Sequence, residues 1–444
     1  MPGGAKRSKG LSLSAAVAFA VGNMIGAGVF VLSGLIIAIA GPSAVISYII
    51  CGLAVAFSGL SYAVLASIYP EDGGGYLYAR RILGPYPGFL AGFAMYISIT
   101  IATAFVLLGF GIYATLLTGA SIDARYAALA GLALLAALNL RGAAEAGRVE
   151  IGLVAAKVAI LAGLILVGLT HVQASDFSPF LPGGASGMLR GVAMIFFAYI
   201  GFQVVAMMGG EVKDSAKNVP LATLASIGIV ALIYTGVVVA LLAARLPSYG
   251  GESVFDASVV YLGPIGGVVV ALAALFSTLS SANANILGAS RVILEMASEE
   301  QIPARFARLR NGQPANSILL GAGITAILIL AGNLSFIVEL TNVTILVAMM
   351  LVNVSALILT GRKTLVSPEK NRFVIPFGPL FPLLGAASCA AMLVTLAPSV
   401  LGLGIAILLA GSLLLLIEDV PERKTIVRNI RLLPTGSDMR MNLF

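Results

Sequence analysis

Two glycine-broken apolar stretches, in matching places in the two halves of the chain, limit its fold more than any other feature. The first break is residues 22–30 (GNMIGAGVF), midway along one apolar run, and the second is residues 196–202 (FFAYIGF), midway along another. Inside a bilayer, such a break leaves backbone N–H and C=O groups without helical partners. It is tolerated only where those groups are buried in protein or line a polar cavity. The pair of breaks therefore predicts a binding site at mid-membrane.

The composition is that of a membrane protein. The chain has 444 residues, of which 59% are hydrophobic and 10% charged, whereas soluble domains carry about 25% charged residues. The apolar residues form long blocks, which predicts an all-α polytopic membrane protein with twelve transmembrane helices. The expected spans are residues 12–40, 43–69, 86–118, 125–140, 150–171, 187–209, 221–244, 263–294, 316–332, 335–360, 376–397 and 399–417.

The Lys and Arg residues predict the orientation. With the N-terminus inside and twelve crossings, only Arg125, Arg190 and Arg245 fall in outer segments. The positive-inside rule then favours cytoplasmic N- and C-termini in a multi-pass protein of the cell membrane. The net charge of +7 is read as this topology signal, so no nucleic-acid partner is expected.

The position of the breaks predicts an internal repeat. If Gly26 and Gly201 are equivalent, spans one to five (residues 1–172) and six to ten (residues 173–361) form two repeats. Because five is odd, the second repeat is inverted relative to the first. Spans eleven and twelve and the tail (residues 362–444) fall outside the repeats.

The backbone N–H and C=O groups that the two breaks leave without helical partners suit a zwitterionic ligand. A half-helix that begins after the first break points free N–H groups at the cavity, which suits a carboxylate. Carbonyl groups freed on the other side of that break, and at the second break, suit an ammonium group. The alternative reading is a helix-packing face of small residues. The expected ligand-binding residues are Met24, Gly26, Ala27, Gly28, Phe197, Ala198 and Ile200.

Lys157 is the one clear charge in the interior of a span. Ionisable groups at such depth are functional candidates, and a buried lysine can gain and lose a proton. The alternative is that its stem reaches toward the inner headgroups. Span eight offers partners for a protonated lysine, unless their side chains bond to their own helix backbone. These are Ser277, Thr278, Ser280, Ser281, Asn283 and Asn285.

Three motifs carry a family likeness over essentially the whole chain. They are residues 22–30, residues 70–80 (PEDGGGYLYAR), and residues 197–202 followed by Glu211 and Pro220. In this order and spacing they resemble the first helix, first cytoplasmic loop and sixth helix of the amino acid–polyamine–organocation (APC) transporter superfamily. The resemblance implies a LeuT-like fold, with a five-plus-five inverted repeat and discontinuous helices 1 and 6 that rocks between outward- and inward-open states.

The resemblance also implies roles for residues at the breaks. The backbone of Ala27 and Gly28 would meet a substrate carboxylate, and the carbonyls of Met24, Phe197 and Ile200 would meet its amine. Phe197 matches the aromatic side chain that closes over substrate.

Within the superfamily the chain looks closest to the archaeal proton-coupled transporters of the ApcT type. In that type a fifth-helix lysine stands where sodium-coupled relatives hold a sodium ion, and Lys157 matches it. Gly22 matches the carbonyl that this lysine contacts, and Ser280 or Ser281 would be its eighth-helix partner. The chain departs from the common pattern at Gln203, where many members carry an acid.

These observations predict a secondary active transporter of neutral L-α-amino acids, coupled to protons through Lys157. An obligate amino acid exchanger of the same fold is the alternative, and a channel or membrane enzyme is a distant one, since the chain has neither an H-E-x-x-H site nor a selectivity-filter signature. No catalytic residue, cofactor or metal site is expected. The expected partners are the amino acid substrate, protons and the lipid bilayer, for a monomer or homodimer. Contacts to the substrate side chain are expected from Phe197, Ala102, Thr103 and Ile286.

Overall fold

Helices and short connections make up the described part of the computed structural model, which covers residues 11–69, 73–119, 121–141, 147–207, 212–310, 312–361, 373 and 377–417. The main helices are α1 (Leu13–Met24), α2 (Ser33–Ala40), α3 (Ala44–Ile68), α4 (Gly74–Leu83), α5 (Pro85–Thr118), α6 (Ala124–Arg141), α7 (Gly147–Leu169), α8 (Gly184–Tyr199), α9 (Val204–Met207), α10 (Ser215–Ala243), α11 (Ser253–Ser298), α12 (Ala315–Ala331), α13 (Leu334–Gly361), α14 (Leu380–Thr395) and α15 (Pro398–Ile417).

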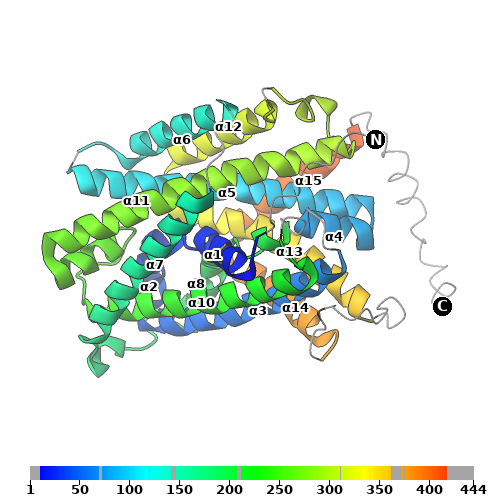
Figure 1. The fold of residues 1–444 in the computed structure, drawn as a ribbon. Coiled ribbons are helices and arrows are strands. Elements are labelled where there is room, and N and C mark those ends of the chain that lie inside the picture. Colours follow the sequence, from blue (N-terminus) through cyan, green and yellow to red (C-terminus); the bar gives the residue numbers. More distant parts are fainter. Residues whose placement is uncertain are drawn as a thin grey trace.

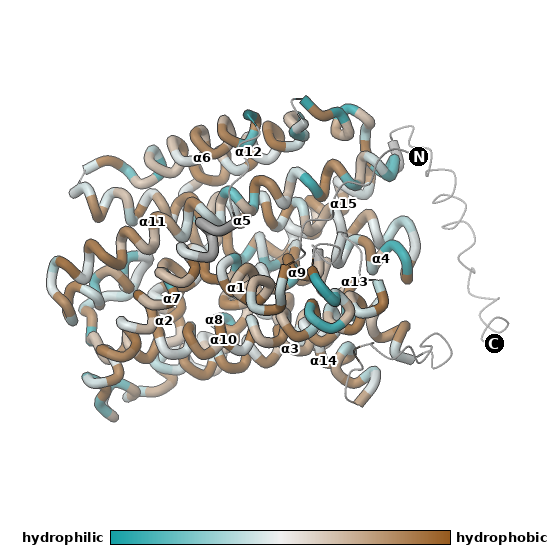
Figure 2. Tube along the Cα trace, viewed as in Figure 1, coloured by the Kyte–Doolittle hydropathy of each residue, from teal (hydrophilic) through white to brown (hydrophobic). Residues whose placement is uncertain are grey.

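Most of the helices coincide with the apolar stretches expected from the sequence. Six helical stretches of the described residues are long and apolar enough to cross a membrane, and α1, α12 and α14 are among the shorter apolar helices. In Figure 2 hydrophobic residues follow the helices over most of their length, and hydrophilic residues gather near helix ends, for example along α4. The all-α polytopic class is therefore confirmed. The division into twelve spans and two inverted repeats stays a prediction, and residues 70–72, Glu211 and both chain termini lie outside the described residues.

The two broken helices lie in the middle of the bundle. Figure 1 shows α6 and α12 together at one edge and α3, α10 and α14 at the other, with α1 and α8 between them. The long helix α5 packs against α11, α13 and α6. Helix α1 begins where the Ser12 hydroxyl accepts a hydrogen bond from the Ala15 N–H at 3.3 Å, which supplies a partner for one of the free donors of the first turn.

Two helical segments lie outside the expected spans. Helix α4 follows the first loop motif, and its mixture of charged and apolar residues breaks the continuous apolar pattern that marks a span. Helix α11 begins ten residues before the expected start at residue 263, and Gly263 has a positive φ of 66° next to Pro264. Proline lacks the N–H that would continue the hydrogen-bond ladder, so α11 bends there, and the long apolar part follows the bend.

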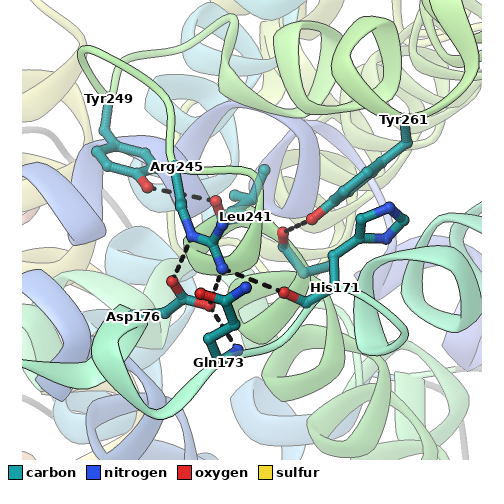
Figure 3. Close-up of polar contacts among 8 residues, drawn as sticks. His171, Gln173, Asp176, Leu241, Arg245, Tyr249 and Tyr261 are labelled. Atoms are coloured by element: carbon teal, nitrogen blue, oxygen red, sulfur yellow. Dashed lines mark hydrogen bonds and ion pairs between the residues drawn. The ribbon is translucent and has the colours of Figure 1, made fainter.

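A polar cluster joins the segment between α7 and α8 to the residues that follow α10. Figure 3 shows Arg245, which follows α10, facing Asp176 in the short 3₁₀ helix Ala174–Phe177. The Arg245 Nε donates to Asp176 Oδ1 at 2.6 Å, and Nη2 donates to the His171 carbonyl at 3.3 Å. The hydrogen bond from Arg245 lowers the pKa of the Asp176 carboxyl below its ordinary value of 3.8. The cluster ties the segment between α7 and α8 to the end of α10.

Candidate functional site

The first break begins where α1 ends at Met24. Ile25 leaves helical geometry, with φ −78° and ψ 73°, and its N–H still reaches the Val21 carbonyl at 2.9 Å. The Gly26 N–H then turns back to the Met24 carbonyl at 2.8 Å, and a π-helical turn runs from Gly28 to Leu32 before α2. The last carbonyls of α1 therefore point out of the helix and need other donors.

The second break separates α8 from α9. Ile200 is extended, with φ −59° and ψ 128°, and Gly201 has a φ of 131° that favours glycine. The Gly201 N–H donates to the side-chain Oε1 of Gln203 at 2.9 Å. Gln203 is buried, so the residue that departs from the superfamily pattern satisfies a backbone donor that the break leaves free.

The two breaks pack directly against each other. A Cβ atom on Gly28 would lie 3.0 Å from the Ala198 Cβ, and a Cβ atom on Gly201 would lie 3.1 Å from the Met24 nitrogen. Both distances are shorter than ordinary side-chain contacts. Glycine at these two positions is therefore what lets the backbones of the broken helices approach each other.

Tyr234 of α10 joins the two breaks. Its hydroxyl lies 2.7 Å from the Met24 carbonyl oxygen and 2.9 Å from the Ala198 carbonyl oxygen. A phenol has one proton and donates to one carbonyl at a time. The ring packs edge-on against Tyr48 and Tyr199, with centroids 5.8 and 5.4 Å away. Sequence reasoning missed this residue, and the available signal was the one aromatic residue of the span at residues 221–244.

Lys157 of α7 reaches the end of α1. Its Nζ donates to the Gly22 carbonyl at 2.5 Å and to the Ile25 carbonyl at 2.6 Å, and lies 3.4 Å from the Ser277 hydroxyl of α11. The Lys157 side chain is buried at 4% exposure, so the ammonium head faces the broken helix and not a headgroup layer. A cation at this place stabilises carbonyls that a helix C-terminus leaves free.

The serine that Lys157 contacts lies one turn from the pair expected on the sequence. Ser277 also donates to the Ile25 carbonyl, at 2.6 Å. The Ser281 hydroxyl is buried and has no hydrogen-bond partner among the described residues, and a Cβ atom on Gly26 would lie 2.8 Å from it. Ser280 is half-buried on the same helix. Ser277 and Ser281 are one turn apart on the same face of α11. Which of them contacts Lys157 depends on how far along its axis α11 passes the lysine.

The remaining expected residues gather at the same place. Met24, Ala27, Phe197 and Ala198 are all buried, and the Phe197 ring meets the Phe105 ring of α5 edge-on, with centroids 4.6 Å apart. Among the described residues, no group of three His, Cys, Asp or Glu side chains could hold a metal ion. The described residues of the site offer a ligand backbone N–H and C=O groups, the hydroxyls of Tyr234 and Ser277, and the Lys157 ammonium.

Comparison with known proteins agrees with this site. Residues 15–402 match the family described as amino acid permease. The methylthioribose transporter of Bacillus subtilis is 28% identical over 408 residues, covering 83% of this chain and 84% of that protein. The branched-chain amino acid permease BcaP of Lactococcus lactis is 28% identical over 410 residues (83% and 85%), and the inner membrane transport protein YbaT of Escherichia coli is 30% identical over 363 residues (79% and 84%). The chain therefore belongs to the amino acid permease family, in the amino acid–polyamine–organocation superfamily of transporters.

Proposed function

We propose that this protein is a secondary active transporter that carries neutral L-α-amino acids together with protons by alternating access. Its family makes it a transporter of amino acids or related substrates and not an enzyme. The observation that carries the finer proposal is the pair of bonds from Lys157 Nζ to the Gly22 and Ile25 carbonyls at the first break. The charged ammonium of Lys157 would hold α7 to the end of the broken helix through these two bonds.

The substrate head group would lie between the two breaks. Free N–H groups at Ala27 and Gly28 favour a carboxylate at the start of the second half-helix. Carbonyls of Met24, Phe197 and Ile200 favour the amine. The Met24 carbonyl accepts from the Gly26 N–H and from Tyr234. Tyr234 can turn its one proton to the Ala198 carbonyl instead, which leaves the second lone pair of the Met24 oxygen for the amine.

The surrounding side chains support a neutral substrate. Phe197 lies beside the breaks, and Ala102, Thr103 and Ile286 are buried and would contact the substrate side chain. Gln203 is neutral and its Oε1 is bonded to the backbone of the second break. A cationic side chain would bury its charge there without an acidic partner from these residues, which costs free energy.

Protonation would couple to transport through the end of α1. Protonated Lys157 bridges the Gly22 and Ile25 carbonyls, and Ser277 of α11 joins them at Ile25. Loss of the proton removes the positive charge and one donor, so α1 is held less firmly against α7 and α11. This change favours movement of α1, which is the step that releases substrate in an alternating-access cycle.

The test is uptake into substrate-free proteoliposomes under an inward proton gradient, with a panel of amino acids. We expect neutral amino acids to accumulate with wild-type protein, and accumulation to lose its dependence on the gradient in Lys157→Ala. Lys157→Arg is the control, because it keeps the charge but titrates only at far higher pH. Full gradient-driven accumulation by Lys157→Ala would overturn the coupling role.

An obligate exchanger of the same fold is the second candidate, because superfamily exchangers can also carry a fifth-helix lysine. Such a protein needs substrate on both sides of the membrane. Uptake that appears only in liposomes preloaded with amino acid would favour the exchanger. Net uptake into empty liposomes would favour the proton-coupled transporter.

The proposed topology has both termini in the cytoplasm, residues 1–172 and 173–361 as inverted repeats, and a cell-membrane location. Cys51 and Cys389 are both buried, so a cysteine introduced in a loop is the reactive thiol of the folded protein. An introduced cysteine at Ser298 should react with an impermeant reagent only after cells are opened. One at Ser248 should react in intact cells.

A further inference from the structure

A small cavity with several hydroxyls in a mainly apolar lining lies between α5, α11 and α12. Its volume is about 10 Å³, and its lining includes Thr100 of α5, Ile286 of α11, and Ser317 and Gly321 of α12. A single buried water molecule needs about 10–15 Å³ measured in this way. The cavity therefore has room for one water molecule and not for an amino acid side chain.

Three buried hydroxyls lie at or beside this cavity, and none makes a hydrogen bond of normal geometry to another described residue, although those of Tyr96 and Thr100 are close enough to interact with each other. They belong to Tyr96, Thr100 and Ser317, whose side chains are 2%, 2% and 1% exposed. Tyr96 and Thr100 are one turn apart on α5, and an ideal Cβ atom on Gly321 would lie 3.8 Å from the Tyr96 hydroxyl and 3.9 Å from Thr100 Oγ1. Ser317 is one turn before Gly321 on α12. Thr100 and Ser317 therefore line the cavity from two helices, and the Tyr96 hydroxyl lies beside it, near Gly321.

Neighbouring hydroxyls in the same place are satisfied by backbone. Thr103 donates to the Ile99 carbonyl at 2.8 Å, and Thr325 donates across the helix interface to the Thr100 carbonyl at 3.1 Å. The usual way to satisfy a hydroxyl inside a membrane helix is thus in use nearby. Tyr96, Thr100 and Ser317 do not use it, although leaving a buried hydroxyl unpaired is costly.

We propose that this cavity is a binding site for one ordered water molecule, which joins α12 to α5 by bonding the hydroxyls of Tyr96, Thr100 and Ser317. Water fits the volume, and three hydrogen bonds is the usual number for a buried water. Water also donates and accepts, so it can satisfy hydroxyls of either polarity. An inorganic cation fits less well, since none of the three hydroxyl groups is charged.

Gly321 has a defined part in this site. Because the atoms nearest its ideal Cβ lie at 3.8 Å or more, an alanine at this position fits without a steric clash. Its methyl group would occupy the space that the water needs. Gly323, on the same helix, has no atom within 4 Å of its ideal Cβ and is the matched control.

The test measures thermal unfolding of the purified full-length protein in detergent with a thiol-reactive fluorophore, since Cys51 and Cys389 are buried until the protein unfolds. Alanine ordinarily stabilises a helix relative to glycine, so Gly323→Ala should keep or raise the unfolding midpoint. Gly321→Ala should lower it, because the three hydroxyls lose their shared partner. Gly321→Ser should unfold above Gly321→Ala, reversing the usual helix preference, because the new hydroxyl replaces the water.

A second variant tests the site without changing Gly321. Thr100→Val keeps the shape of the side chain and removes its hydroxyl. If the hydroxyl bonds water, this variant should lower the unfolding midpoint, whereas removal of an unpaired hydroxyl from a dry cavity is neutral or stabilising. A midpoint of Gly321→Ala that rises as in Gly323→Ala, or a Thr100→Val midpoint at or above wild type, would overturn the proposal.

Discussion

The contacts of Lys157 predict a specific non-additive effect on stability. Lys157→Met keeps a long apolar side chain and removes the ammonium group. The Ile25 carbonyl then retains the Ser277 hydroxyl at 2.6 Å, whereas the Gly22 carbonyl loses the lysine that bonds it at 2.5 Å. A buried carbonyl deprived of its donor costs about 1–3 kcal/mol. Removing the ammonium also removes the cost of burying its charge, so we expect a loss of unfolding free energy no larger than this.

Ser277→Ala alone should cost less. The Ile25 carbonyl keeps its bond from Lys157 at 2.6 Å, so the variant loses one hydrogen bond, worth about 0.5–1.5 kcal/mol. In the double variant the Ile25 carbonyl has neither donor. The double variant should therefore lose about 1–3 kcal/mol more than the sum of the two single variants.

Denaturant titration in mixed micelles measures these free energies of unfolding. Ser280→Ala, a half-buried serine on the same helix, is the matched control, and its combination with Lys157→Met should be additive. Additivity of Lys157→Met and Ser277→Ala within about 0.5 kcal/mol would refute the sharing of the Ile25 carbonyl. If Ser280→Ala couples to Lys157→Met as strongly as Ser277→Ala does, the contact between α11 and Lys157 is not made by Ser277 alone.

Three further outcomes follow from single residues. Tyr234→Phe should lower the free energy of unfolding by about 1–3 kcal/mol and reduce amino acid uptake in proteoliposomes, because the Met24 and Ala198 carbonyls lose their shared donor. Gly201→Ala should destabilise by about 1–3 kcal/mol, since its φ of 131° strains other residues; Gly228→Ala, with an open Cβ position, should not. Asp176→Asn should be less stable than wild type at neutral pH. That difference should shrink as the pH falls below 3.8, because Arg245 lowers the pKa of Asp176 and protonation removes the pair.

The fold was largely predictable because the signal is long-range and repeated. Apolar blocks of membrane length indicate helices whatever their partners are, and helices such as α5 and α13 end within one or two residues of the expected bounds. Helix α4 and the first part of α11 were missed, because they do not have the continuous apolar character of a span. Their helical state depends on local pattern and tertiary contacts.

The candidate site was predictable only where the backbone itself carries the signal. Glycines at 26, 28 and 201 marked both breaks, because Gly201 has a φ of 131° and a Cβ atom at Gly26 or Gly28 would crowd Ser281 or Ala198. The contact between Lys157 and Gly22 followed from a family resemblance. The choice of Ser277 depends on how α11 passes the end of α1, which a sequence with serines at positions 277, 280 and 281 does not determine. Tyr234 was missed because an aromatic residue in an apolar span usually serves packing.

Glu339 shows the same dependence on tertiary structure. Near the end of an apolar span it looks like an interfacial residue, yet its side chain is buried at 2% exposure. It accepts from Arg190 Nη2 at 2.6 Å, and its second oxygen accepts from the Ala397 N–H at 3.4 Å. Arg190 lies 149 residues before Glu339 in the chain, so no local sequence pattern predicts this ion pair. Burying a carboxylate at such a place requires a partner of this kind.

If the proposed function holds, the hydrogen bonds at the end of α1 would let one element respond to both substrate and proton. Met24 is bonded by Tyr234 of α10, and Ile25 by Lys157 of α7 and Ser277 of α11. These are adjacent peptide groups, so a ligand ammonium that draws on the Met24 carbonyl and a proton that leaves Lys157 act on the same turn of backbone. Since Tyr234 has one proton for two carbonyls, an arriving ammonium can take the Met24 carbonyl while Tyr234 keeps Ala198. In the proposed cycle both carbonyls therefore keep a donor when substrate binds, and deprotonation of Lys157 would loosen the turn of backbone that the substrate contacts.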